Sequence, residues 1–346
     1  MQIMRILSVL FYLILIGINF VGLNMGKNYY IFSSGKLRRK ENTLFLETDN
    51  FKKPIPIEEI DQIFAFGELD FNTKLLVFLA QNGIVLHVFN YYGYYAGSFY
   101  PREKLLSGTL LIRQVEHYLD SRKRLELAKK FVEGAAHNIK RNLEKRNSRT
   151  QVEKIKNLSQ RIEEIKTINE LMSLEAHIRK TYYSVWETIT GWEFKDRKFR
   201  PPDNPLNALI SFANSLVYAS IVREIYMTAL NPTVSYLHEP FERRFSLALD
   251  VAEIFKPVLA DRLIFRVINL GKLKLEHFDK SLQFSYLTEE GRKIFVAEYD
   301  DFLEKTIVHR ALKRKVKYKS LIRLELYKIV KHLLGEKNYK PLKVWW

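Results

Sequence analysis

The chain has 346 residues, of which 47% are hydrophobic and 13% aromatic. That length and apolar content suffice for two domains with separate cores and exclude a disordered protein. The formal net charge of +17 points to an anionic partner, either nucleic acid or an acidic membrane surface. Because the chain contains no cysteine, disulfides, thiolate zinc sites and cysteine nucleophiles are excluded.

The first stretch carries no charge from Ile6 to Asn24, and its length approaches the roughly 20 residues that span a bilayer. The residues after it form a poor signal-peptide cleavage site, and a strand pattern begins at Lys27. We therefore expect Met25 to be the true start and residues 1–24 to be upstream sequence translated in frame. A genuine membrane anchor is the alternative. With the start at Met25, we expect a cytoplasmic protein without stable membrane attachment.

From Lys27 to about Tyr100, short segments rich in Ile, Val, Phe and Tyr alternate with Gly and Asn, which is typical of strands. One helix is expected among them, with Asn72 as its N-cap and Gly83 closing it. A tyrosine cluster follows, at Tyr91, Tyr92, Tyr94 and Tyr95. Tyrosines can stack on nucleic-acid bases, but sheet packing or an oligomer interface is their more common role.

At Pro101 the sequence period changes, and nearly everything to about Glu336 has the pattern of amphipathic helices. The predicted fold class is α+β, with a small N-terminal β-rich domain at residues 25–101. A larger all-α C-terminal domain with a basic tail follows at residues 102–346. The helix that begins at Pro205, with Asn204 as its cap, is apolar on most faces and should be the buried centre of this second domain.

The stretch Asn231–Arg262 combines one histidine with two acids in a helical pattern. Asp250 and Glu253 are three residues apart, so they project from one helix face among apolar neighbours. An acid beside a core costs free energy unless it is paired, protonated or bound to a cation, and His238 could bind the same cation. From these residues alone, a metal site and structural ion pairs with nearby arginines both remain open, and ion pairs are the commoner case.

Seven segments, taken in order along the chain, carry a family resemblance. They are YYIFSSGKLRRKENTL at Tyr29–Leu44, HVFNYYGYYAGSFYPRE at His87–Glu103, EGAAHNI at Glu133–Ile139, LEAHIRKTYY at Leu174–Tyr183, RPPDNPLNALISFANSLVY at Arg200–Tyr218, YLHEPFERRFSLALDVAEIFKPVLADR at Tyr236–Arg262 and YKSLIRLELYKIVKHL at Tyr318–Leu333. Together they resemble the CRISPR adaptation integrase, CRISPR-associated protein one, in the variety found with type I-B systems. The resemblance extends essentially from Met25 to the end.

This resemblance implies an N-terminal β domain that forms a homodimer and a helical domain that binds Mg2+ or Mn2+. The implied ligands are Glu175, His238 and Glu253, although the family often has Asp at the last position. Asp250 completes the implied catalytic set, either behind the ligands or as a substitute ligand. Oxygen ligands with one imidazole suit these cations and leave positions open for phosphate and water.

The implied activity is that of a metal-dependent DNA endonuclease and integrase in CRISPR adaptation, an antiviral defence. Such an enzyme joins the 3′-hydroxyl of a short foreign DNA to a strand at the repeat array by transesterification, and with water as nucleophile it acts as a nuclease. The competing hypothesis is a DNA-binding scaffold whose acids are structural and which does not catalyse.

The implied partners are double-stranded and branched DNA, a second copy of the chain, and CRISPR-associated protein two. Arg243 and Arg244 are expected to hold phosphate near the site, unless they pair with Glu239 and Glu242. The segment Arg310–Trp346 holds twelve Lys or Arg and two Glu, so it carries ten of the seventeen net positive charges. DNA is expected to lie along its most basic strip. The strip comprises Lys313, Arg314, Lys315, Lys317, Lys319 and Arg323.

Overall fold

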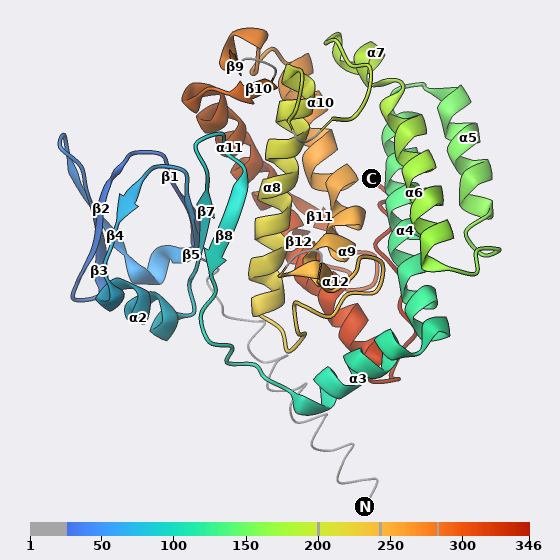
Figure 1. The fold of residues 1–346 in the computed structure, drawn as a ribbon, viewed down its shortest axis with the longest axis horizontal. Helices are drawn as coiled ribbons and strands as arrows, with labels where there is room; N and C mark the ends of the chain where they lie inside the picture. Colours follow the sequence, from blue (N-terminus) through green and yellow to red (C-terminus); the bar gives the residue numbers. More distant parts are fainter. Residues whose placement is uncertain (1–25, 199–200, 242–243, 282–283) are drawn as a thin grey trace, which may run out of the picture.

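The N-terminal part of the chain is strand-rich and the C-terminal part is mainly helical, as the sequence predicts (Figure 1). The computed structural model describes residues 26–198, 201–241, 244–281 and 284–346. The uncharged stretch Ile6–Asn24, and with it the question of a membrane anchor, lies outside the described residues.

Eight strands of the N-terminal region form two four-stranded sheets, with the orders β4-β3-β2-β6 and β1-β5-β7-β8. In the second sheet β1, β5 and β7 are parallel, and β8 pairs antiparallel with β7. The elements are β1 (Lys27–Ile31), β2 (Gly35–Lys40), β3 (Thr43–Glu47), β4 (Lys52–Pro56), a 3-10 turn (Ile57–Glu59), β5 (Ile60–Ala65), β6 (Leu69–Asp70), α2 (Thr73–Asn82), β7 (Val85–Phe89) and β8 (Tyr95–Phe99).

The predicted boundaries of α2 are confirmed. The Asn72 side chain accepts a hydrogen bond of 3.2 Å from the Leu75 amide, and Gly83 ends the helix in the left-handed conformation with φ of +66°. Every residue of β5 is buried, because this strand has a layer on each of its faces. Phe66, which follows β5, contacts Phe212 of the helical region at a ring distance of 5.8 Å, so this second sheet joins the two parts of the protein.

The helical region contains ten helices of at least five residues among the described residues, together with a π-helix and two short hairpins. The elements are α3 (Gly108–Leu119), α4 (Ser121–Glu144), α5 (Arg149–Gln160), α6 (Ile168–Tyr183), α7 (Trp186–Thr190), α8 (Pro205–Tyr226), α9 (Ser246–Phe255), the π-helix (Lys256–Asp261), α10 (Arg262–Asn269), a 3-10 turn (Leu275–His277), β9 (Phe278–Ser281), β10 (Phe284–Leu287), α11 (Glu289–Glu304), β11 (Thr306–Val308), β12 (Lys315–Lys317) and α12 (Tyr318–Leu333).

The prediction of an all-α second domain is wrong at the two hairpins. β9 pairs antiparallel with β10, and β11 pairs antiparallel with β12. Strands of three or four residues are too short to interrupt a helical period in a sequence window, although the run Thr306–Val308 is β-branched throughout. The second hairpin carries part of the predicted DNA-binding strip, so Lys313, Arg314 and Lys315 lie on a hairpin and not on a helix.

Helix α8 is the buried centre of the helical region, as predicted. The Asn204 side chain accepts from the Asn207 amide at 2.8 Å, and Pro205 occupies the first turn. Among the described residues α8 is the one helix long and apolar enough to cross a membrane, and 78% of the relevant window is buried inside the protein. In Figure 1 it stands beside β7 and β8, with α9 and α10 on its other side.

Polar contacts also connect the two regions. The buried Arg223 of α8 donates to the Asp61 carboxylate at 2.9 Å. Tyr95 of the predicted tyrosine cluster packs edge to face on Tyr218 at a ring distance of 5.0 Å. Within the second sheet, His87 is fully buried and its ring nitrogens lie 2.7 Å from Ser98 Oγ and 3.0 Å from a Gln62 side-chain oxygen. These contacts place a titratable imidazole inside the sheet that joins the two regions.

We predict that stability falls in mild acid because of His87. Burial, reinforced by the charge of Arg223, lowers the pKa of His87 to about 3, below its ordinary value near 6.5. Below about pH 6.5 the unfolded chain binds a proton that the folded protein excludes, so folding weakens as the pH falls towards 3. Between about pH 7.5 and pH 5 this residue should reduce the free energy of unfolding by about 2 kcal/mol.

Urea unfolding of wild type and His87→Gln at several pH values measures this contribution. The variant should lose that part of the pH dependence, whatever its stability at neutral pH. Identical pH profiles for the two proteins would show that His87 does not carry the effect.

Candidate functional site

Glu175 lies on α6, a helix whose start is well specified by the sequence. The Thr167 side chain accepts from the Glu170 amide at 3.2 Å, and the Glu170 carboxylate accepts from the Thr167 amide at 3.3 Å, which forms a capping box. The helix buries an apolar stripe, namely Leu171, Leu174, Ile178 and Tyr182. Glu175 and Arg179 lie four residues apart beside this stripe and therefore face the same way.

Glu253 lies in the last turn of α9, two residues before the helix ends at Phe255. Pro257 follows four residues later and has no amide hydrogen to donate to the Glu253 carbonyl. The chain continues there as a π-helix, a form that is frequent at functional sites. Two side chains of α4 hold this segment: Asn138 donates to the Ile254 carbonyl at 3.1 Å and Asn142 to the Pro257 carbonyl at 2.7 Å. The backbone directly after Glu253 is thus held against α4.

The two acids meet at one guanidinium. Arg179 Nε donates to Glu175 Oε1 at 2.9 Å, and Arg179 Nη2 donates to the Glu253 carboxylate. Lys256 Nζ lies 2.5 Å from the other Glu253 oxygen. The exposed fraction of the side chain is 23% for Glu175, 7% for Glu253 and 11% for Arg179. Tertiary structure therefore joins two of the three predicted metal ligands, from helices far apart in sequence, through a shared cation.

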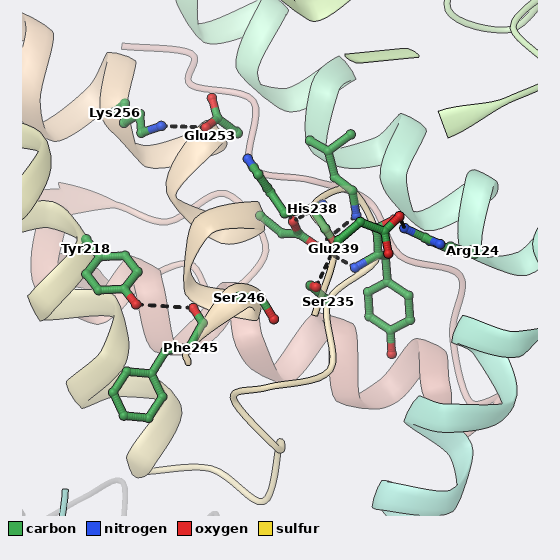
Figure 2. A network of polar contacts seen from close by, with 12 residues as sticks. Arg124, Tyr218, Ser235, His238, Glu239, Phe245, Ser246, Glu253 and Lys256 are labelled. Atoms are coloured by element: carbon green, nitrogen blue, oxygen red, sulfur yellow. Dashed lines mark hydrogen bonds and ion pairs between the residues drawn. The ribbon is translucent and has the colours of Figure 1, made fainter. Parts of the chain in front are cut away.

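His238 is positioned by Asp250, which is completely buried. One Asp250 oxygen accepts from the amides of Tyr236 and Leu237 at 2.6 and 3.0 Å. The other accepts from the His238 amide at 2.9 Å and lies 2.8 Å from His238 Nδ1. Both Asp250 oxygens are thus engaged by this segment, and one of them orients the imidazole through Nδ1. In Figure 2 the His238 ring extends towards the turn of α9 that carries Glu253.

Electrostatics couple the three predicted ligands. Burial and the negative charge of Glu253 raise the pKa of Glu175. Burial alone would raise the pKa of Glu253, but Lys256, Arg179 and His238 hold it well below its ordinary value. Burial opposes protonation of His238, but Asp250 and Glu253 outweigh it and raise the pKa of the imidazole. The site thus stabilises positive charge at the imidazole and negative charge at Glu253.

The residues do not form a finished coordination shell. Within the described ranges, no three His, Asp or Glu side chains are grouped closely enough to hold a metal ion. The reason lies in the partners: Arg179 and Lys256 occupy the carboxylate oxygens of Glu253, and Arg179 also binds Glu175. No role was assigned to Arg179 or Lys256 from the sequence. Their spacing could have indicated these ion pairs. Arg179 lies four residues after Glu175 and Lys256 three after Glu253, so each pair shares a helix face.

Of the two arginines expected near the site, the structure describes Arg244. Arg243 and its possible partner Glu242 lie outside the described residues. Arg244 is exposed, with its guanidinium 5.1 Å from the centre of the Phe245 ring. Glu239 binds Arg124 of α4 at 2.7 Å, as Figure 2 shows. Arg244 is therefore oriented by an aromatic ring and is presented to solvent.

The predicted DNA-binding strip divides into two parts. Three of its residues are exposed on the β11–β12 hairpin: Lys313, Arg314 and Lys315. Lys317 and Lys319 both bind Glu304, at 2.5 and 2.6 Å, and Lys319 is buried. Arg323 binds both oxygens of the buried Glu224, at 2.6 and 3.2 Å. Arg323 is thus held by a buried acid that would lose its partner if Arg323 turned outward, whereas the buried Lys319 is held by a partly exposed one.

We predict that Asp250→Ala destabilises the protein by about 3 kcal/mol or more, because three buried backbone amides lose a charged acceptor. Arg244→Ala, next to the same helix but exposed, should change stability by less than about 0.5 kcal/mol. Chemical denaturation of both variants measures the difference. Equal stabilities would mean that Asp250 does not organise this segment.

Comparison with known proteins gives a consistent result. A family model described as "CRISPR associated protein Cas1" matches residues 29–301. A curated relative from Moorella thermoacetica, "CRISPR-associated endonuclease Cas1 2", is 64% identical over 320 residues, which are 92% of this chain and 100% of the relative. A solved CAS1 protein from Thermotoga maritima is 41% identical, with a TM-score of 0.85 over 90% of this chain and 98% of its own.

Two more distant solved structures share the fold. A casposase bound to integration product has a TM-score of 0.80 and 18% identity, over 91% of this chain and 92% of its own. A chain of a Cas6-RT-Cas1–Cas2 complex has a TM-score of 0.81 and 16% identity, over 93% of this chain and 36% of its own.

Proposed function

This chain belongs to the Cas1 family of CRISPR-associated proteins, and from that premise we propose that it is a metal-dependent DNA endonuclease and integrase. The reaction we propose is the insertion of short foreign DNA into a CRISPR array by transesterification. Relatives of high identity are named endonucleases, and a casposase bound to integration product has the same fold. The observation that carries the proposal is the meeting of Glu175 and Glu253 at the Arg179 guanidinium, with the His238 ring extending towards Glu253 (Figure 2).

Glu175, Glu253 and His238 are the residues that would hold Mg2+ or Mn2+. Their chemistry fits, because two carboxylates and one imidazole are a suitable donor set for these cations. The two carboxylates already share a cationic partner, and the imidazole has only Nδ1 engaged by Asp250. A bound divalent cation would polarise the scissile phosphate, neutralise charge in the transition state and lower the pKa of the attacking oxygen.

The residues of the chain prepare this site in distinct ways. Asp250 fixes the orientation of the His238 ring through Nδ1 and leaves Nε2 for ligation. Lys256 and Arg179 keep Glu253 ionised, which a ligand carboxylate requires. Arg244 presents an exposed guanidinium beside α9 that can bind a DNA phosphate.

The proposed joining step conserves the number of phosphodiester bonds. A 3′-hydroxyl of the incoming DNA loses its proton and forms a new P–O bond at the target phosphate. The bond from that phosphate to the 3′-oxygen of the target strand breaks, and that oxygen takes up a proton. Because one diester replaces another, the step needs no external source of energy. Hydrolysis follows the same course with water as the nucleophile.

Three kinds of partner belong to the proposal. DNA would contact Lys313, Arg314 and Lys315 of the exposed hairpin, by sequence-tolerant phosphate binding. CRISPR-associated protein two is proposed because a Cas1–Cas2 complex contains a chain of this fold. A homodimer through the N-terminal strands and a cytoplasmic location follow from the family resemblance.

We predict that His238→Ala and Glu253→Gln each reduce strand joining by at least about 100-fold, because each removes a ligand. The assay uses Mn2+, the small partner protein, a labelled short duplex and a supercoiled plasmid with a repeat array. Glu133→Gln, on α4 and paired at the surface with Lys343, is the control and should join normally. A chelator should abolish joining by wild type, and added Mn2+ should restore it.

Equal joining by wild type and both ligand variants would show that the assigned ligands are wrong. If no protein joins strands but all bind DNA, the chain is a DNA-binding scaffold and the catalytic proposal fails.

We predict that replacing Lys313, Arg314 and Lys315 together by alanine weakens DNA binding and lowers the slope of log affinity against log salt by about 3. The matched control replaces three exposed basic residues of α5, which are Arg149, Lys154 and Lys156. Fluorescence anisotropy with a short duplex at several salt concentrations gives both slopes. An unchanged slope for the hairpin variant would exclude the hairpin from the DNA path.

A further inference from the structure

The side chains of Arg179 and Lys256 form ion pairs with two of the predicted ligands, Glu175 and Glu253. Arg179 is nearly enclosed, with 11% of its side chain exposed, and it contacts both carboxylates. Its Nη2 also lies 3.5 Å from the Glu253 carbonyl oxygen. Pro257, four residues later, has no amide hydrogen with which to bind that oxygen. Lys256 contacts the second oxygen of Glu253 from the next helical turn. Both cations would have to share or release carboxylate oxygens for a divalent cation to bind.

The charges at this point already balance. Glu175 and Glu253 together carry two negative charges, and Arg179 and Lys256 carry two positive charges. The charge of Asp250 is engaged separately by three backbone amides and His238. A divalent cation added to this balanced, largely buried set would leave two uncompensated positive charges, which is costly in a poorly solvated site.

A DNA phosphodiester supplies negative charge at the point where a divalent cation adds positive charge. The guanidinium and the ammonium are groups that bind phosphate oxygens well, and both side chains are long enough to move between partners. The cation and the DNA phosphate would therefore bind more tightly together than separately, and Arg179 and Lys256 would carry that coupling.

We propose that Arg179 and Lys256 are positioning residues that make binding of the divalent cation depend on the presence of DNA. With DNA absent, they neutralise Glu175 and Glu253 and compete with the cation. With DNA present, they release carboxylate oxygens to the cation and bind the phosphate that lies beside it. This inference rests on the proposed function, because it assumes that Glu175 and Glu253 are ligands.

The test measures Mn2+ affinity by electron paramagnetic resonance, with and without a short DNA duplex whose 3′ ends lack the hydroxyl. In wild type, the duplex should tighten Mn2+ binding about tenfold or more, a usual size for coupling between two ligands. In Arg179→Gln, Mn2+ should bind more tightly than in wild type when DNA is absent, and the effect of DNA should shrink. Lys256→Gln should change both quantities in the same direction.

Arg179→Lys keeps the positive charge and should retain most of the coupling, which separates charge from simple packing. Arg323→Gln breaks a comparable buried pair on α12 and should leave the coupling unchanged. Thermal unfolding of each variant confirms that it is folded. If Arg179→Gln does not fold, Lys256→Gln decides the question, because 23% of the Lys256 side chain is exposed.

The outcomes separate the two proposals. If wild type binds Mn2+ equally well with and without DNA, or if Lys256→Gln retains the full coupling, the further inference is wrong while the proposed function stands. If wild type binds no Mn2+ under either condition, the assigned metal site fails and the proposed function fails with it.

Discussion

The pairing of Glu175 and Glu253 through Arg179 is the interaction on which the functional part of this structure depends. Two carboxylates in a largely apolar setting repel one another, and each would lose most of its hydration. A shared guanidinium offsets part of both penalties and connects α6 to α9 at that level. The same pairing makes the acids available as a set, since neither can move far without releasing the other.

The surrounding fold supports this pairing from two directions. Helix α4 packs against both α6 and α9, and its buried asparagines bind the carbonyls of Ile254 and Pro257 where the helical pattern changes. On the other side, α8 forms a buried support between α9 and the sheet that contains β5 and β7. Asp250 then uses the start of α9 to hold the His238 segment in place. Glu175, His238 and Glu253 are therefore each attached to buried structure.

The large positive charge of the chain serves two physical purposes. Arg223 and Arg323 are buried or nearly so and neutralise the buried acids Asp61 and Glu224. The basic side chains at the tip of the β11–β12 hairpin remain exposed and can contact phosphate. Charge density along a sequence does not distinguish these uses, because a buried ion pair and a solvated lysine contribute equally to a count. Burial and partner identity distinguish them.

The sequence by itself determined the order of strand-rich and helical regions, the caps of α2 and α8, and the buried character of α8. These features follow from local rules: residue period, capping side chains and the conformations open to glycine and proline. Segment resemblance then indicated Glu175, His238 and Glu253 as a group. The two short hairpins were not predicted, because a strand of three or four residues is too short to show an alternating pattern.

Only the tertiary structure decided the roles of Arg179, Lys256 and Asp250, and the separation of Arg323 from the exposed basic residues. Each of these roles depends on which partner lies within hydrogen-bonding distance after elements far apart in sequence have packed. Three backbone amides converge on the Asp250 carboxylate, and one of its oxygens also lies beside the His238 ring. Such convergence is a property of chain packing in three dimensions, and local sequence spacing does not contain it.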